Sequence, residues 1–322
     1  MAKKVLFVLN PKAGKGLIKN KILDILDMLV KNGLEVTVHT TQRKLDGYET
    51  VKNSAKKYQY LLISGGDGTL SECIKGYMET DIKKRPVIGY IPAGSTNDFA
   101  QSLKLPKNMI TAASNLVDGR LFKCDIGKFN NDYFIYIAAF GAFTDVSYDT
   151  PQDLKNLLGH TAYILEGIKR VTSLQKYCMT IEHDETSITG EYIYGMISNT
   201  LSVGGLTSLG KEKVKLDDGL FEVILVKYPQ NPIEIQMIVT GILTSDFSSK
   251  VFTTFKTSKA VFKSQSEVHW TLDGEDGGAY KETVIENITK AIPIMVSPKK
   301  TKPAPEKWLI HDRYKIFIMD NE

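Results

Sequence analysis

In the first hundred residues, short apolar runs alternate with segments whose apolar residues recur at helical spacing. The runs at 4–9 and 60–63 predict buried strands, 86–91 predicts another strand, and 34–39 alternates between apolar and polar residues as a strand does. Apolar residues recur every three or four positions over 18–29, as in an amphipathic helix, and Gly33 is predicted to close this helix. Strands that alternate with helices indicate right-handed βαβ units around a parallel sheet. We therefore predict a Rossmann-like α/β domain at the N-terminus.

Past about residue 120 the pattern changes to runs typical of strands. A hairpin is predicted from 121–128 and 133–139. One long helix is predicted to begin at Thr150, with an apolar face through Ile168 that favours a place in the core over lipid binding. A second apolar helical pattern covers 233–243. The second domain is thus predicted to be β-rich, antiparallel and sandwich-like, with further strands at 177–183, 190–198, 220–227, 251–256, 260–263 and 267–272.

These patterns divide the chain into two predicted domains, 1–125 and 126–287. The apolar run 291–296 indicates one more strand, so about 288–322 is expected to return to the first domain. The tail after Pro298 has no role that its sequence indicates.

Composition restricts the class of protein. Of the 322 residues, 42% are hydrophobic and 24% charged, which is ordinary for a soluble globular protein. The net charge of +4 suits an anionic partner but falls far short of a nucleic-acid signature. Three scattered cysteines favour a reducing compartment. No signal-peptide core and no run of about 20 apolar residues is present, so a cytoplasmic protein is expected.

Three polar, glycine-containing loops, 10–16, 64–69 and 92–98, follow predicted strands. Ligands of parallel sheets bind at the carboxyl ends of the strands, where these loops would meet. In the second loop, glycines let backbone N–H groups approach phosphate closely, and Asp67 beside an anion implies an intervening cation such as Mg²⁺. The alternative is a glycine-rich turn with a helix-capping Asp, and this motif alone does not separate the two. The loop 10–16 is not a Walker motif and, taken alone, favours a solvated basic turn.

Two acidic clusters, 215–221 and 272–277, lie in the β-rich half. Each could be a simple Asp-Gly turn. A kinase, however, needs a base for its acceptor hydroxyl, and a carboxylate from the second domain that faces the nucleotide loops would provide one.

Five motifs follow one another along the chain: Asn10-Pro11-Lys12-Ala13-Gly14-Lys15-Gly16, Gly65-Gly66-Asp67-Gly68-Thr69-Leu70, Pro92-Ala93-Gly94-Ser95-Thr96-Asn97-Asp98, Leu216-Asp217-Asp218-Gly219 and Asp273-Gly274-Glu275. In this order they resemble the diacylglycerol-kinase-like lipid kinases, a family that also includes sphingosine kinases. The similarity runs from residue 4 to about 297, and Thr150 to Tyr163 looks like the soluble bacterial diacylglycerol kinases.

The resemblance implies roles for individual residues. Glu275 would take the proton from the lipid hydroxyl, and Asp67 would organise the catalytic Mg²⁺, supported by Asp98 and Asp125 with Lys15 nearby. The first domain would bind ATP and the second the lipid. The residues implied to line the ATP site are Asn10, Pro11, Lys12, Ala13, Gly14, Thr41, Gly65, Gly66, Asp67, Gly68, Thr69, Leu70, Ser71, Ser95 and Asn97.

The resemblance also implies a second, structural Mg²⁺ held by Asp218 with the backbone of Lys215 and Leu220, for which an Asp-Gly turn is the alternative. The approach to this site, Gly210 to Val214, lacks the Pro-x-Ala often found in the family, and Ser71 stands where many relatives have Asn.

The implied activity is transfer of the ATP γ-phosphoryl group to diacylglycerol, giving phosphatidic acid. Alternatives are another lipid alcohol (a sphingoid base, a prenol or phosphatidylglycerol), an NAD-kinase-type enzyme, or a non-catalytic nucleotide- or lipid-binding regulator. The expected partners are ATP, a membrane lipid alcohol and an anionic membrane surface contacted transiently, without nucleic acid. A homodimer is implied by the resemblance alone.

Overall fold

The structure is a computed structural model that describes residues 2–141, 175–200, 202–203, 206–207 and 215–298. The long helix predicted from Thr150 and the tail after Pro298 lie outside the described residues.

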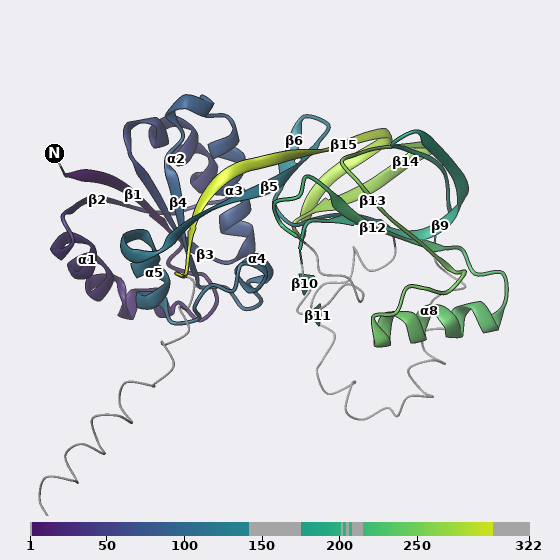
Figure 1. Cartoon of the computed structure of the whole chain (residues 1–322), viewed down its shortest axis with the longest axis horizontal. Coiled ribbons are helices and arrows are strands. Elements are labelled where there is room, and N and C mark those ends of the chain that lie inside the picture. The colour runs from purple at the N-terminus through teal and green to yellow at the C-terminus, as the bar shows by residue number, and fades with distance from the viewer. Residues whose placement is uncertain (1, 142–174, 201, 204–205, 208–214, 299–322) are drawn as a thin grey trace, which may run out of the picture.

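The N-terminal part contains a parallel sheet with the strand order β2–β1–β3–β4–β15, as Figure 1 shows. Its first four strands match the predicted apolar runs to within one or two residues, and the side chains of Val5 to Leu9 are almost fully buried. A parallel strand covered on both faces needs such an uninterrupted apolar run. These four strands are β1 (Lys3–Leu9), β2 (Leu34–Thr40), β3 (Tyr60–Gly65) and β4 (Val87–Pro92).

Helices cover both faces of this sheet. One apolar cluster joins the sheet to α1 and α5 through residues such as Ile25 and Leu116, and another joins it to α2 and α3 through Val51 and Ile74. Gly33 follows α1 at φ +76, as its predicted closing position requires. The helices are α1 (Ile22–Lys31), α2 (Asp46–Ser54), α3 (Asp67–Met78), α4 (Asp98–Ser102) and α5 (Met109–Asp118), with short 3-10 turns at Leu17–Asn20, Ala55–Lys57 and Ile82–Lys84.

The second part is built from antiparallel strands around an aromatic core. Trp270 makes edge-to-face contacts with Phe140, Phe129 and Phe262 at centroid distances of 4.9, 5.3 and 5.2 Å. Such pairs stabilise beyond simple burial of area. The strands are β5 (Arg120–Phe129), β6 (Asp132–Phe134), β7 (Ile137–Gly141), β8 (Tyr177–His183), β9 (Thr186–Ser198), β12 (Phe221–Lys227), β13 (Phe252–Thr257), β14 (Lys259–Leu272) and β15 (Glu275–Val296), with β10 (Ser202–Val203) and β11 (Leu206–Thr207) forming a separate pair.

Strand β15 connects the two parts. It pairs with β14 at its start and lies parallel to β4 at Ile294, next to Ile88, so the run 291–296 does return to the first part (Figure 1). The 22-residue strand spans the boundary predicted near residue 288, although its pairing with β5 shifts there, between Ile288 and Ile292. The two parts therefore share one 13-stranded sheet, and the exact division into domains remains a prediction.

The strand pairing differs from the sequence prediction in two places. Of the run 133–139, only β6 pairs with β5, whereas β7 pairs with β14 and β9. The backbone between β6 and β7 turns its amides to the carboxylate of Asp273 instead. The runs 260–263 and 267–272 form the single strand β14, whose pairing with β15 shifts between Lys263 and Val268.

The predicted helix 233–243 is α8 (Pro232–Thr244), which lies at the far edge of the second part (Figure 1). The side chain of Asn231 caps it by accepting from the backbone N–H of Glu234, and Pro232 is its first residue. Over the residues that the structure describes, no helix is both long and apolar enough to cross a membrane.

Candidate active site

The three glycine-containing loops meet at the carboxyl ends of β1, β3 and β4. The backbone N–H of Asn10 donates to Ser64 at 2.8 Å, and that of Ala93 donates to Gly65 at 2.8 Å. The Asn10 side-chain amide donates to the hydroxyl of Thr69 at 3.0 Å. Thr41 joins them because its N–H donates to the carbonyl of Leu9 at 2.9 Å. The nucleotide-loop residues predicted from separate parts of the sequence therefore lie side by side.

Close backbone approach explains the glycines in these loops. Gly14 has φ +54, and a Cβ there would lie 2.4 Å from the carbonyl oxygen of Ala93. A Cβ on Gly94 would lie 2.5 Å from the Cα of Gly66. Distances of this size are steric clashes, so only glycine allows the loops to pack this way. The result is a concentration of backbone groups at the start of α3, the type of place where phosphate binds.

The side chains on these loops differ in their orientation. Lys12, Lys15 and Ser95 are exposed, whereas Leu70 and Ser71 are buried and turned away from the loops. Asn97 closes its own loop, since its side-chain oxygen accepts from the N–H of Gly94 at 2.9 Å and its side-chain nitrogen donates to the Gly94 carbonyl at 2.8 Å. The side chains of Leu70 and Ser71 are therefore not exposed at the loops, and the backbone N–H of Leu70 already donates to the carbonyl of Gly66 at 3.0 Å.

Asp67 is the first residue of α3, but its carboxylate does not cap that helix. It accepts instead from the backbone N–H of Asp98 at 3.2 Å and of Phe99 at 3.5 Å, at the start of α4. Burial raises the pKa of Asp67 to about 6, and the nearby negative charges of Asp98 and Asp273 add to this while the two hydrogen bonds oppose it. Asp98 itself is buried. Asp67 therefore caps α4 rather than its own helix, and its carboxylate joins two of the loops.

Glu275 comes from the opposite part of the molecule. It directly follows the turn Asp273-Gly274 between β14 and β15, and its Oε1 lies 3.5 Å from the position that a Cβ on Gly68 would occupy. Its Oε2 accepts from the ammonium of Lys44 at 3.0 Å. The structure therefore brings Glu275 to the start of α3, where it lies near Gly68, the residue that follows Asp67 in the sequence.

Two residues in this region were not singled out by the sequence: Lys44, which contacts Glu275, and Tyr90, whose hydroxyl donates to the carbonyl of Gly65 at 3.1 Å. Asp273 belongs to a predicted motif but was given no role, and in the structure it is almost fully buried in the turn. The Asp-Gly pair signals a turn, but nothing local indicates that its carboxylate is buried. Burial raises the pKa of Asp273, and the hydrogen bonds from Tyr136, Ile135, Ser71 and Ile137 oppose that shift.

The carboxylate of Asp125 contacts other segments than that of Asp67 does. Its buried carboxylate accepts from the N–H of Lys290 at 2.6 Å and of Gly219 at 2.7 Å, so it holds the Asp217-Asp218-Gly219 turn against β15. Burial raises the pKa of Asp125, and the charges of Asp218 and Asp217 add to the shift. In that turn Asp218 is exposed and accepts from the N–H of Leu220 at 3.2 Å. The supporting catalytic role of Asp125 and the structural metal site remain predictions.

The side chains around Asp67 are of the chemical kind that binds a divalent ion such as Mg²⁺. The carboxylates of Asp67 and Asp98 offer hard oxygen ligands. A neighbouring cation would offset the cost of burying the negative charge of Asp67. No three His, Cys, Asp or Glu side chains among the described residues are grouped closely enough to hold a metal by themselves.

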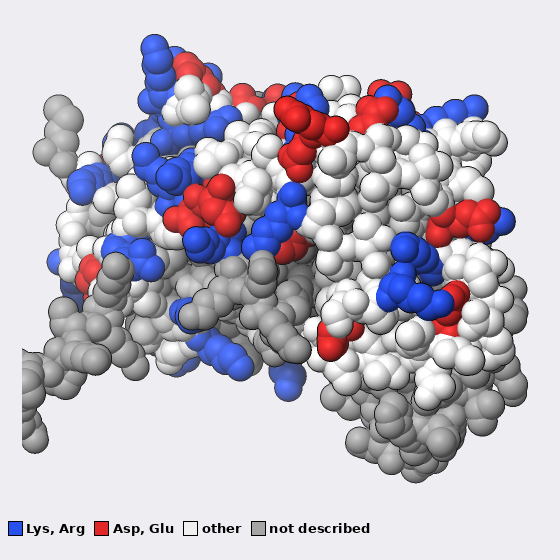
Figure 2. Space-filling model, turned by 45° about the vertical axis from the view of Figure 1, so that its right-hand side comes forward, with Lys and Arg blue, Asp and Glu red and all other residues white. Residues whose placement is uncertain are grey.

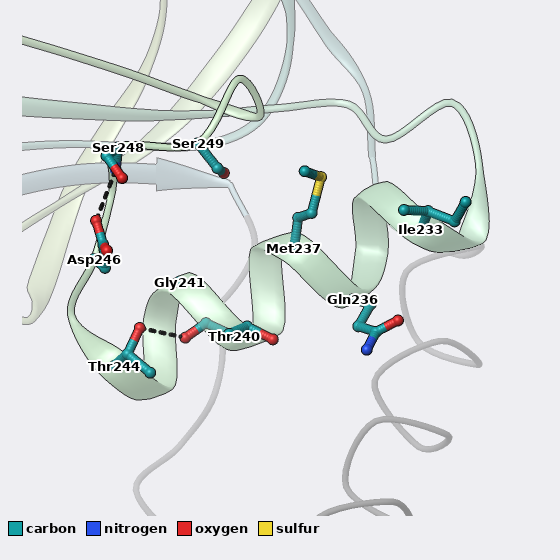
Figure 3. Close-up of a pocket in the computed structure, with 9 residues that line it drawn as sticks. All are labelled: Ile233, Gln236, Met237, Thr240, Gly241, Thr244, Asp246, Ser248 and Ser249. Carbon is teal, nitrogen blue, oxygen red and sulfur yellow. Dashed lines mark hydrogen bonds between the residues drawn. The ribbon is translucent and has the colours of Figure 1, made fainter.

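Two surface features lie outside this region. A pocket of about 290 Å³ lies between α8 and the residues that follow it, lined among others by Ile233, Met237 and Ser249 (Figure 3). None of the predicted site residues lines it. Figure 2 shows one face of the molecule on which Lys and Arg gather more densely over the N-terminal part, with acidic residues among them.

The chain is similar to known proteins over most of its length. Residues 4–129 match the family model of the diacylglycerol kinase catalytic domain. The diacylglycerol kinase of Staphylococcus saprophyticus is 34% identical over 280 residues, which are 86% of this chain and 90% of the relative. That of Staphylococcus aureus is also 34% identical, over 86% of this chain and 88% of the relative.

Comparison with solved structures shows a similarity to the same group of proteins. A Bacillus anthracis protein provisionally described as a diacylglycerol kinase superposes with a TM-score of 0.78 at 26% identity, over 93% of this chain and 99% of the other. The same parallel sheet with a sheet-rich second domain is thus shared. Together with the two Staphylococcus relatives, this places the chain in the diacylglycerol kinase family of enzymes.

Proposed function

We propose that the protein transfers the γ-phosphoryl group of ATP to the primary hydroxyl of diacylglycerol, giving ADP and phosphatidic acid. One observation carries the proposal: Glu275, from the sheet-rich second part, lies beside Gly68 at the start of α3, next to Asp67. A carboxylate of one part thereby faces the phosphate-binding loops of the other. The proposed base and the proposed nucleotide site would therefore adjoin each other.

ATP would bind at the three loops, which offer backbone N–H groups and the positive end of the α3 dipole to its phosphates. The close packing of Gly14 on Ala93 and of Gly94 on Gly66 keeps side chains out of this space. Exposed Lys12 and Lys15 would add positive charge near the phosphates. We propose residues 1–125, with the returning end of β15, as the ATP-binding domain.

In the transfer step, the oxygen of the lipid hydroxyl forms a bond to the γ-phosphorus as the bond from that phosphorus to the β–γ bridging oxygen breaks. The hydroxyl proton passes to the carboxylate of Glu275, and ADP leaves with the electron pair of the broken bond. Catalysis then comes mainly from positioning and charge neutralisation. Proton transfer to a well-placed base contributes on the order of 10²–10⁴-fold.

Asp67 and Asp98 are the residues that we propose would hold Mg²⁺, which would neutralise charge on the phosphates. We propose the Asp218 turn, with the backbone of Lys215 and Leu220, as a separate structural Mg²⁺ site. Hard oxygen ligands at an exposed turn are consistent with it. The hydrogen bond from the N–H of Gly219 to Asp125 supports a role of Asp125 in holding this turn. Its supporting role at the catalytic Mg²⁺ is proposed from the family alone.

The lipid would be drawn from the cytoplasmic face of a membrane, to which the protein binds transiently. The Lys and Arg side chains over the N-terminal part support attraction to anionic headgroups (Figure 2). A homodimer is a further proposal, and it rests on the family alone.

The test is phosphorylation of defined acceptors by the purified protein with γ-labelled ATP and Mg²⁺. Separate reactions contain mixed micelles of diacylglycerol, sphingosine, a prenol or phosphatidylglycerol, and one contains NAD. We expect label in phosphatidic acid, dependent on Mg²⁺ and lost in Glu275→Gln. Label in another lipid alcohol would change the acceptor but keep the mechanism, whereas label in NAD, or in none of them, would overturn the proposal.

A further inference from the structure

We propose that Asp273 is a positioning residue for phosphoryl transfer: it fixes the Asp273-Gly274 turn to the backbone of residues 135–137 and to Ser71, and so holds Glu275 at the start of α3. This inference rests on the proposed function, in which Glu275 receives the proton. Asp273 itself touches neither the nucleotide loops nor the reacting atoms in this account.

The Asp273 carboxylate has its acceptor positions filled from the protein. Its oxygens accept from the backbone N–H of Ile135 at 2.8 Å, Tyr136 at 3.0 Å and Ile137 at 3.2 Å, and from the hydroxyl of Ser71 at 2.9 Å. Only 4% of the residue is exposed. Hydrogen bonds to a buried ionised group are stronger than neutral ones, and leaving their donors unpaired is costly. The turn is therefore held rigidly at this carboxylate.

The backbone of the turn transmits this position to Glu275. Asp273 and Gly274 have φ values of +52 and +85, and Leu272 pairs with Glu275 across the two-residue turn. Positive φ at both turn residues is the geometry that suits the twist of a tight hairpin. Because only Gly274 separates the anchored residue from Glu275, the Glu275 backbone has little freedom to move.

The bond from Ser71 sets the position of the turn relative to α3. Gly68, Ser71 and Lys75 are spaced by three and four residues, so they share one face of the helix. That face meets the second part at each point: Gly68 at Glu275, Ser71 at Asp273, and the Lys75 ammonium at the Asp132 carboxylate at 2.6 Å. The helix that begins with Asp67 is thus aligned with the turn that ends at Glu275.

The test is a double-mutant cycle with Asp273→Asn and Glu275→Gln in the diacylglycerol phosphorylation assay. Asn keeps the size of the side chain but replaces an acceptor oxygen with a donor that faces backbone N–H groups. We expect kcat to fall by about 10²-fold, as misplacement of a reacting group by ~1 Å would cause, with the KM for ATP within about threefold of the wild type. The double variant should be no slower than Glu275→Gln alone.

Asp132→Asn is the matched control, because it removes another carboxylate that contacts α3 but lies away from the turn. It should leave kcat within about threefold. A kcat for Asp273→Asn within threefold of the wild type would overturn the inference. So would losses that multiply in the double variant, since a residue acting through Glu275 has no effect once Glu275 is gone.

Two further measurements keep the outcome decisive. If Asp273→Asn does not fold, Ser71→Ala removes a single hydrogen bond to Asp273 and should lower kcat by about tenfold; an unchanged kcat would count against the inference. Hydrogen exchange needs no activity: Asp273→Asn should speed exchange at residues 135–137 and 275–276 but not in β2. Wild-type protein that phosphorylates no lipid would overturn the proposed function. Hydrogen exchange would still show whether the Asp273 carboxylate holds the turn in place.

Discussion

The ammonium of Lys44 lies 3.0 Å from the carboxylate of Glu275, although 231 positions separate the two residues. Lys44 follows β2 in the N-terminal part, on the same loop as Thr41, and Glu275 begins β15 in the second part. The hydrogen bond and charge of Glu275 raise the pKa of Lys44. The proposed base is thus held by a cation from the nucleotide side of the site.

Lys44→Ala should therefore affect catalysis more than stability. The pair is exposed, with 74% and 52% of the side chains accessible, and exposed ion pairs stabilise proteins little. We expect kcat/KM for the lipid to fall by about 2- to 10-fold, which is the effect of weaker orientation of Glu275, with Tm unchanged. Lys44→Arg should retain most activity. Arg43→Ala is the control, since Arg43 pairs with Glu49 instead; an equal loss there would contradict a specific role of Lys44.

Glu275→Gln should separate chemistry from nucleotide binding. Without a base for the hydroxyl proton, lipid phosphorylation should fall by about 10²–10⁴-fold. Affinity for a fluorescent ATP analogue, measured by titration, should change by less than about threefold because Glu275 belongs to the other part. Glu282→Gln, on the exposed side of the same strand β15, is the control. Undiminished phosphorylation by Glu275→Gln would exclude Glu275 as the base.

Asp67→Asn should make the Mg²⁺-free protein more stable at pH 7.5. The pKa of Asp67 is about 6 in the folded protein against 3.8 ordinarily, so the native state binds its proton more tightly than the unfolded state. The Asp67 contribution to the free energy of unfolding is accordingly highest below pH 3.8, falls between pH 3.8 and 6, and is lowest above pH 6. The Asn variant should gain about 1–3 kcal/mol at pH 7.5 and little at pH 4, as measured by urea unfolding.

The same substitution should abolish activity, because a proposed Mg²⁺ ligand is lost. A variant that is less stable at pH 7.5, or stabilised equally at pH 4 and 7.5, would contradict the raised pKa of Asp67.

Gly14→Ala should weaken ATP binding through a steric effect on the loops. Its Cβ would lie 2.4 Å from the carbonyl oxygen of Ala93, and its φ is +54. Gly33→Ala is the matched control, since φ is +76 but nothing lies within 4 Å. Gly33→Ala should lose about 1–2 kcal/mol of stability because of its positive φ, and Gly14→Ala should lose more because of the added clash. Only Gly14→Ala should raise the KM for ATP, by about tenfold or more. Equal KM values would mean that this close approach does not shape the nucleotide site.

Local patterns in the sequence determined the elements of the N-terminal part. Parallel strands buried on both faces must be continuous apolar runs, and helices that cover them must carry an apolar stripe, so both are visible residue by residue. The convergence of the loops around Asn10, Gly66 and Gly94 followed from the same pattern, because neighbouring parallel strands end at one edge. The place of Glu275 in the site came from family resemblance, which local periodicity could not provide.

Only the tertiary structure decided how the second part meets the first. The burial of Asp273, its bond to Ser71 and the pair of Lys44 with Glu275 join residues that are far apart in the chain. The break of the predicted run 133–139 into β6 and β7 has the same origin, since the amides there bind Asp273. A local sequence pattern records whether a residue is polar, but a buried carboxylate is stable only where distant segments bring it enough donors, and that depends on how the whole chain packs.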